Sequence, residues 1–140
     1  MRTTSSSSPQ KLHFISGLPR AGSTLLAGIL RQNPRFHAAM TSPVAPLLNT
    51  FLEQVGANGE FSPFFTESKR RDMCRALLSA YYAEMVDRPV IFDTNRIWTA
   101  RLHQLVELFD GFKVICCVRN PAWIMDSFEV IYRKNPRYGG

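Results

Sequence analysis

The chain has 140 residues, of which 45% are hydrophobic and 20% charged, so it can bury the core of one folded domain and is not disordered throughout. Its apolar runs are too short for a membrane span, no apolar leader follows the N-terminus, and three cysteines without CxxC spacing predict neither a disulfide framework nor a zinc site. We therefore expect a cytoplasmic protein.

The charge is basic, with 17 Lys and Arg against 11 Asp and Glu, a formal net charge of +6. Thirteen of the 17 cations are arginines, whose planar guanidinium suits phosphate and sulfate groups. Most of these arginines are expected on a solvated surface. No basic run is interleaved with aromatic residues, so a small anionic ligand is expected in place of nucleic acid.

The N-terminal third is expected to hold a tail, a strand and a helix. Residues 1–10 are rich in Ser and Thr without periodicity and predict a disordered tail ahead of a domain over residues 11–140. A β-rich run over 11–16 is followed by a glycine-bounded loop over 17–22. Helical spacing of Leu and Ile then predicts a helix from about residue 23 to 31.

The middle of the chain predicts two helices and a strand. The apolar residues between 47 and 55 share one face of a predicted helix. This helix is expected to end at Gly56, and a loop follows. Thr66 is the expected N-cap of a helix that runs to about residue 86. Its inward side is expected to hold Cys74, Leu77, Leu78, Tyr81 and Met85. A strand is predicted over 89–93.

The last third of the chain predicts a helix, a strand and a further helix. Thr99 is the expected cap of a helix with Leu102, Leu105, Val106 and Phe109 on one face. Residues 112–118 form the clearest strand. Asn120 and Pro121 fit the N-cap and first position of a final helix. Its inward residues are expected to be Ile124, Phe128 and Ile131.

The order of these elements predicts a three-layer α/β fold with a parallel sheet. The strands are uniformly apolar, which is typical of a parallel sheet covered on both faces. Ligands of such sheets bind beyond the carboxyl ends of the strands. Here those ends lead into residues 16–22, 93–96 and 119–121, where the functional site is expected.

The loop after the first strand has the G-x-x-x-x-G spacing of a phosphate-binding P-loop, from Gly17 to Gly22. Backbone N–H groups of such a loop, with a helix N-terminus behind them, bind anions. The residue after Gly22 is Ser23, where nucleotide triphosphatases have Lys, and the cation is Arg20, inside the loop. No residue is a convincing ligand for magnesium, so no metal is expected, and a P-loop kinase with a displaced cation is the weaker alternative.

Two segments together resemble the sulfotransferases that use 3′-phosphoadenosine 5′-phosphosulfate (PAPS). Residues 14–26 resemble that family's 5′-phosphosulfate loop, which has Lys or Arg two residues before the second glycine. Residues 118–127 resemble its 3′-phosphate motif, in which an Arg at a strand end is followed by a Ser eight residues later. Arg119 and Ser127 have this spacing. The resemblance covers residues 11 to about 136 and is closest to bacterial members.

The resemblance implies PAPS as sulfuryl donor, no metal, and a set of binding residues. The 5′-phosphosulfate would be held by Arg20, Ala21, Gly22, Ser23 and Thr24, and the 3′-phosphate by Arg119 and Ser127. Arg20 would also act in catalysis, by stabilising charge on the bridging oxygen of the donor. The acceptor is a small molecule, glycan or peptide that the sequence does not identify.

The general base is the least defined part of this prediction. Cytosolic members of the family have a His after the strand that corresponds to 89–93, whereas this chain has Asp93. Asp93 is either the base or a structural carboxylate paired with Arg96. Family members also continue well beyond the 3′-phosphate helix, so we expect a truncated sulfotransferase domain. A non-catalytic nucleotide-binding remnant is therefore the second hypothesis.

Overall fold

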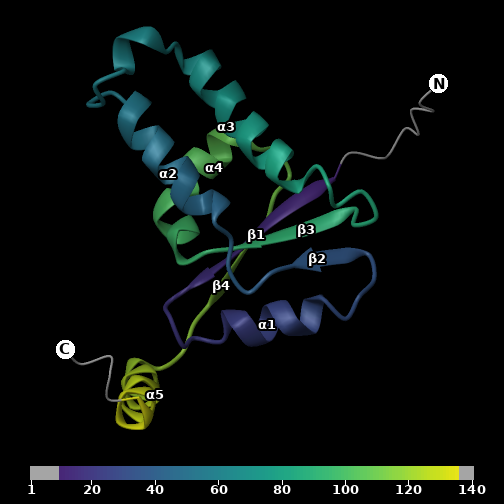
Figure 1. Cartoon of the computed structure of the whole chain (residues 1–140), viewed down its shortest axis with the longest axis vertical. Coiled ribbons are helices and arrows are strands. Elements are labelled where there is room, and N and C mark those ends of the chain that lie inside the picture. Colours follow the sequence, from purple (N-terminus) through teal and green to yellow (C-terminus); the bar gives the residue numbers. More distant parts are fainter. Residues whose placement is uncertain (1–9, 136–140) are drawn as a thin grey trace.

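A single parallel sheet of four strands organises the molecule (Figure 1). The computed structural model describes residues 10–135, so the predicted tail, apart from Gln10, and residues 136–140 lie outside the described part. The strands are β1 (Lys11–Gly17), β2 (Phe36–Ala38), β3 (Val90–Thr94) and β4 (Val114–Cys117). They lie in the order β2-β3-β1-β4, and every pairing is parallel.

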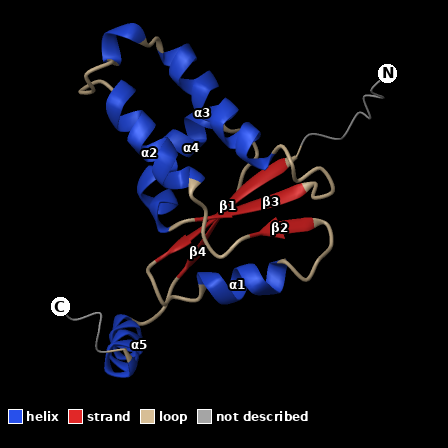
Figure 2. Ribbon diagram, in the orientation of Figure 1, coloured by secondary structure: helices blue, strands red, loops and turns tan. Residues whose placement is uncertain are grey.

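Helices cover both faces of this sheet, which confirms the three-layer α/β prediction (Figure 2). One face is covered by α1 (Ser23–Leu30). The other is covered by α2 (Val44–Val55), α3 (Glu67–Tyr82) and α4 (Leu102–Leu108), with the 3₁₀ turns η1 (Ser62–Phe64) and η2 (Arg96–Arg101) between them. The last helix, α5 (Pro121–Lys134), follows β4 and stands apart from both layers (Figure 1).

Successive side chains of β1 are buried on opposite faces of the sheet, which explains why this strand is apolar on both sides. Phe14 is fully buried in the cluster beneath α2, α3 and α4, where its ring lies 4.8 Å from that of Trp98. Ile15, also fully buried, packs in the opposite cluster with Ala27 of α1. Burial on both faces fixes the register of the strand, because a slip of one residue would exchange the two sets of side chains.

Two predicted helix caps are confirmed by their hydrogen bonds. The Thr66 hydroxyl accepts a bond from the backbone N–H of Lys69 (3.2 Å), and the Asn120 side-chain oxygen accepts one from that of Ala122 (2.9 Å). Pro121 is the first residue of α5. No helix within residues 10–135 has the length and apolar character needed to cross a bilayer.

The structure corrects several local predictions. The strand β2 was not predicted, because three residues are too few to show a period. The helix α3 ends at Tyr82, four residues before the predicted end, and Tyr82 is buried where Tyr81 was expected, since Tyr81 is 42% exposed. The chain must turn there to enter β3, and the Tyr82 hydroxyl is held by that strand.

The region after β3 also differs from its prediction. Thr99 is not a helix cap; it lies within η2, where its backbone N–H and hydroxyl contact the Ser16 hydroxyl. The residue that caps η2 is Asn95, whose side-chain oxygen accepts a bond from the N–H of Ile97 (3.1 Å). As a result α4 begins only at Leu102, and Val106, expected inside, is exposed.

Candidate anion-binding site

The loop between β1 and α1 has a backbone that only certain residues adopt without strain. Gly17 (φ 140°) and Gly22 (φ 110°) have the positive φ angles that glycine tolerates. A Cβ on Gly17 would collide with the carbonyl oxygen of Cys117 in β4, so the loop starts where two strands lie closest. Arg20 also has a positive φ, of 69°, which is uncommon for a residue with a side chain.

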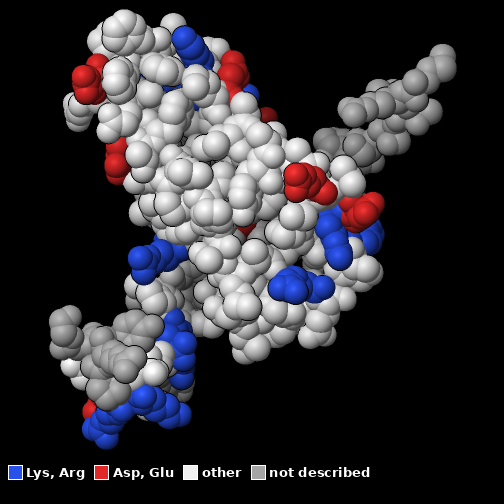
Figure 3. Space-filling view, in the orientation of Figure 1, with Lys and Arg blue, Asp and Glu red and all other residues white. Residues whose placement is uncertain are grey.

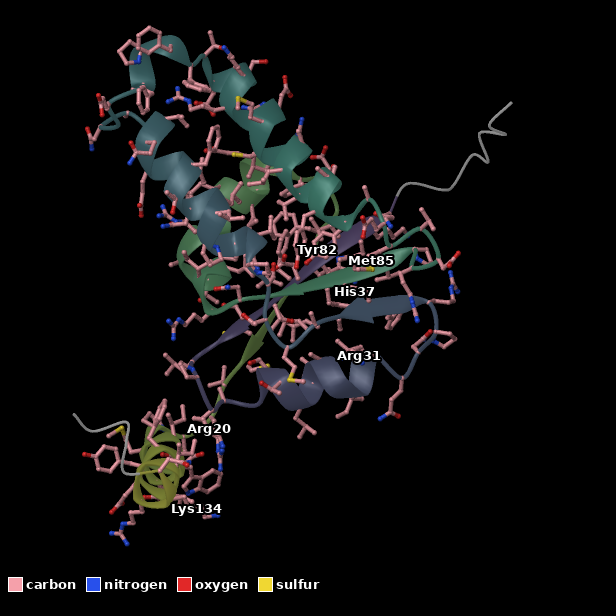
Figure 4. All side chains as sticks on the ribbon, viewed as in Figure 1. Arg20, Arg31, His37, Tyr82, Met85 and Lys134 are labelled. Carbon is pink, nitrogen blue, oxygen red and sulfur yellow. The ribbon has the colours of Figure 1, made fainter. Side chains whose placement is uncertain are left out.

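Two parts of the chain that are far apart in the sequence meet at Arg20: the loop itself and the segment from the end of β4 into α5. Its Nε donates a hydrogen bond to the Ser127 hydroxyl of α5 (2.8 Å), and its carbonyl oxygen accepts one from Nη1 of Arg119 (3.1 Å). Figure 4 shows Arg20 between the sheet and α5. The structure therefore brings together the three residues that the two sequence motifs named. The backbone strain at Arg20 is a property of this meeting point, and such strain is concentrated at functional sites.

The two arginines have no acidic partner within the described part of the chain. Its three ion pairs are Arg70–Glu67, Arg101–Glu53 and Arg133–Glu129. Figure 3 shows Lys and Arg side chains gathered where α5 meets the rest of the molecule. An oxyanion bound in contact with either guanidinium would therefore supply the negative charge that the described part of the chain does not.

A hollow of about 710 Å³ opens beside these arginines, along α1. Its lining includes Arg20, Gly22, Ser23, Thr24 and Arg119. The helix α1 begins with no side-chain cap, so its first N–H groups are available to a ligand. The predicted contact through Ala21 has less support, because the Ala21 N–H already donates to the Leu18 carbonyl (3.0 Å).

A second hollow, of about 830 Å³, lies on the other side of the loop. We call it the β2–β3 cleft, because its walls are the segments that follow β2 and β3, residues 40–50 and 94–97, together with the end of β1 and the start of the loop. Ser23 lines both this cleft and the hollow along α1. The loop thus lies between two hollows, and Ser23 borders both.

Asp93 does not lie with the other predicted site residues. Its side chain is fully buried beneath α3, where one carboxylate oxygen accepts from the Tyr82 hydroxyl (2.6 Å) and the other from Nε1 of Trp98 (2.7 Å). Burial raises the pKa of the Asp93 carboxyl above its ordinary value, and hydrogen bonds from Tyr82 and its other neighbours offset part of this rise. A raised pKa would suit a general base, but this carboxyl has no surface from which it could reach a substrate.

The alternative prediction for Asp93, an ion pair with Arg96, is wrong. Arg96 forms no ion pair within residues 10–135, and it lines the β2–β3 cleft, whereas Asp93 does not. The two hydrogen bonds of the Asp93 carboxylate join β3 to α3 and η2. Sequence reasoning placed it at the ligand edge because alternation along a short strand does not show which face a polar residue takes.

The comparisons with known proteins agree with this geometry. The model of a protein family described as "Sulfotransferase family" matches residues 13–139. The nodulation protein NoeE of Sinorhizobium fredii is 30% identical over 132 residues, which cover 83% of this chain and 30% of NoeE. A solved structure, the sulfotransferase domain from the olefin synthase of Synechococcus PCC 7002, superposes with a TM-score of 0.56 at 23% identity, over 96% of this chain and 57% of that domain.

These matches differ in what they establish. The solved domain shares the fold, while the family match extends over nearly all of the chain. The chain spans under a third of the curated relative and just over half of the solved domain. Because the family match includes both the loop around Arg20 and the helix that carries Ser127, the chain belongs to the sulfotransferase family.

Proposed function

We propose that this chain binds PAPS at the loop between β1 and α1 and takes part in transferring its sulfuryl group to an acceptor in the β2–β3 cleft. The observation that carries the proposal is the meeting of Arg20, Arg119 and Ser127, through two hydrogen bonds, beside a hollow that opens onto the N-terminus of α1. Arg20 and Arg119, neither of which has an acidic partner within residues 10–135, fit a ligand with two separate anionic groups, as PAPS has.

Each residue has a distinct role in this proposal. The N–H groups at the start of α1, with the hydroxyls of Ser23 and Thr24, hold the 5′-phosphosulfate. Arg119 and Ser127 hold the 3′-phosphate. Arg20 stabilises the negative charge that grows on the bridging oxygen as the S–O bond to the donor breaks.

The transfer itself needs few groups from the protein. The sulfuryl sulfur loses its bond to the 5′-phosphate oxygen and gains one to the acceptor oxygen or nitrogen, and the acceptor proton passes to water, because no described residue that lines the cleft is a general base. The desulfated product is adenosine 3′,5′-bisphosphate, PAP. Substitution of Arg20 by Ala should lower the rate by about 10²–10³, as expected for loss of one preorganised donor.

The test measures transfer of labelled sulfate from PAPS to a mixed panel of hydroxyl and amine acceptors. Arg20→Ala should lower the rate of transfer by about 10²–10³, Arg20→Lys should lower it less, and Arg31→Ala should leave it unchanged. Arg31 is a matched control, because it is an exposed arginine at the opposite end of α1 (Figure 4). Equal rates in wild type and Arg20→Ala would remove Arg20 from the mechanism.

A second candidate function, nucleotide binding without transfer, is favoured by one observation. No residue that the structure describes along the β2–β3 cleft is an Asp, Glu, His, Cys, Lys or Tyr, so none could act as a general base there. His37 lies in β2 against the Tyr82 ring and does not line the cleft. PAP binding without detectable transfer to any acceptor would establish this second function.

A kinase is the third candidate and is separated by ligand preference. Calorimetry should find that PAP binds without a metal and more tightly than ATP with Mg²⁺. The opposite preference would favour phosphoryl transfer. The cytoplasmic location and the absence of a nucleic-acid partner stay predictions from the sequence.

A further inference from the structure

Arg96 is the one charged residue in the described lining of the β2–β3 cleft. It lies two residues after the end of β3, as the first residue of η2. The other lining residues are apolar, such as Met40, Pro46 and Ile97, or neutral and polar, such as Thr41 and Asn49. No carboxylate balances the charge of Arg96 there.

The backbone around Arg96 is fixed by hydrogen bonds from several elements. Its carbonyl oxygen accepts from the hydroxyl of Ser16 in β1 (3.0 Å) and from that of Thr99 (3.3 Å). The preceding residue, Asn95, donates through its side-chain amide to the Ser42 carbonyl (3.1 Å) and through its backbone N–H to the Ile15 carbonyl (3.0 Å). The backbone of Arg96 is therefore held in place in the cleft wall, and its side chain is exposed.

Another arginine close to the cleft differs from Arg96 in having partners. Arg101 donates through Nε to the Asn49 side-chain oxygen (2.9 Å) and pairs with Glu53 at 3.8 Å. Asn49 lines the cleft, but Arg101 and Glu53 lie behind it. The charge of Arg101 is thus compensated within the protein, and that of Arg96 is left for a ligand.

We infer that the β2–β3 cleft takes a hydroxyl acceptor that carries an oxyanion, and that Arg96 binds this oxyanion. The inference rests on the proposed function, because it assigns the cleft to the acceptor. A carboxylate, a sulfate or a phosphate on the acceptor would each supply the charge that Arg96 lacks, through charge-assisted hydrogen bonds. A cationic acceptor would meet an uncompensated arginine and no acid, so the cleft disfavours amines.

The test uses three phenols of matched size that differ in the charge at one end. They are para-hydroxyphenylacetate, para-hydroxyphenylacetamide and tyramine, which are anionic, neutral and cationic at pH 7. Each is titrated by calorimetry into the full chain saturated with PAP. The acid should bind about tenfold more tightly than the amide, as expected for a charge-assisted bond weakened by solvent, and tyramine should bind most weakly. Raising the salt concentration should shrink the difference.

Substitutions of Arg96 test whether its side chain causes the preference for the acid over the amide. Arg96→Gln should abolish the difference between acid and amide and leave PAP affinity unchanged, and Arg96→Lys should retain part of the difference. Arg35→Gln is the control, because Arg35 is an exposed arginine just before the amino end of β2, at the opposite edge of the sheet. It should bind all three phenols as the wild type does.

The outcomes separate this inference from the proposed function. If PAP does not bind, the donor assignment fails, and the same titrations on the free chain still test Arg96. If PAP binds but the acid binds no better than the amide, or no phenol binds, the acceptor inference is wrong. A preference that persists in Arg96→Gln overturns the role of Arg96.

Discussion

Substitution of Asp93 by Asn tests whether this residue is structural, and the structure sets the size of the effect. The side chain is fully buried, and its two oxygens accept bonds from Tyr82 and Trp98, both of which are buried donors. An amide has one oxygen and cannot accept both bonds. One donor is left unsatisfied in the core, which costs about 1–3 kcal/mol. We therefore expect Asp93→Asn to lower the free energy of unfolding by this amount.

The effect should depend on pH with a defined sign. Burial raises the pKa of the folded-state carboxyl above its unfolded value, so its contribution to stability is complete below about pH 4 and is lost as the pH rises through the folded-state pKa. The asparagine variant has no such titration. The difference in unfolding free energy between wild type and Asp93→Asn should therefore be largest in acid and become smaller as the pH increases.

Urea unfolding, followed by circular dichroism at several pH values, measures this difference. Tyr82→Phe removes the other side of one bond, and the double variant completes a mutant cycle, in which the two substitutions should be non-additive by about 1 kcal/mol or more. PAP affinity should stay near that of wild type in Asp93→Asn. A stability within about 0.5 kcal/mol of wild type, the range of ordinary surface substitutions, would refute the structural role.

Three further predictions concern the loop, a helix cap and the histidines. Gly17→Ala should lower both the melting temperature and PAP affinity, because the new Cβ collides with β4. Gly28→Ala is the control: Gly28 lies within α1 with open space around it, so this variant should be neutral or stabilising by up to about 1 kcal/mol. Thermal melts of the two variants, with and without PAP, measure both effects. Thr66→Ala should cost about 1 kcal/mol of unfolding free energy, measured in urea, since it removes the cap of α3, and an unchanged midpoint would show that the cap contributes nothing. Burial, together with nearby cations, lowers the pKa of His13 and of His37 below 6.5 in the folded state, so the free energy of unfolding should fall as the pH drops below 6.5. Replacing both histidines by Gln should make the free energy of unfolding, measured in urea, less dependent on pH in this range.

The layered fold could be predicted because its evidence is spread along the chain. Uniformly apolar strands separated by helices indicate a covered parallel sheet, and this prediction does not depend on any single boundary. The errors occur where tertiary contacts decide. Tyr82 faces inward because Asp93 accepts its hydroxyl bond, and Thr99 lies in a 3₁₀ turn because Ser16 holds it, and neither contact leaves a periodic pattern in the sequence.

One part of the candidate site could be predicted from the sequence and another could not. Arg20, Arg119 and Ser127 were predicted from the resemblance to two sulfotransferase motifs. They lie together because the loop after β1 and the segment after β4 both follow strands whose carboxyl ends lie at the same edge of the sheet. The β2–β3 cleft was missed as a whole, since it depends on a strand of three residues and on the path of the chain after it. The sequence indicated Arg96 only as a partner for Asp93. Its position within residues 93–96, at the ligand edge of the sheet, is the feature from which its place in the cleft lining could have been predicted.

The central claim is that Arg119 and Ser127 bind a 3′-phosphate, and the most direct test compares PAP with AMP, which lacks only that phosphate. Bonds from an arginine and a hydroxyl together contribute about 2–4.5 kcal/mol, so wild type should bind PAP at least about thirtyfold more tightly than AMP in calorimetry. Arg119→Ala should remove most of this preference and Ser127→Ala part of it, while AMP binding stays nearly unchanged in both. Equal affinity of the wild-type chain for PAP and AMP would contradict the account.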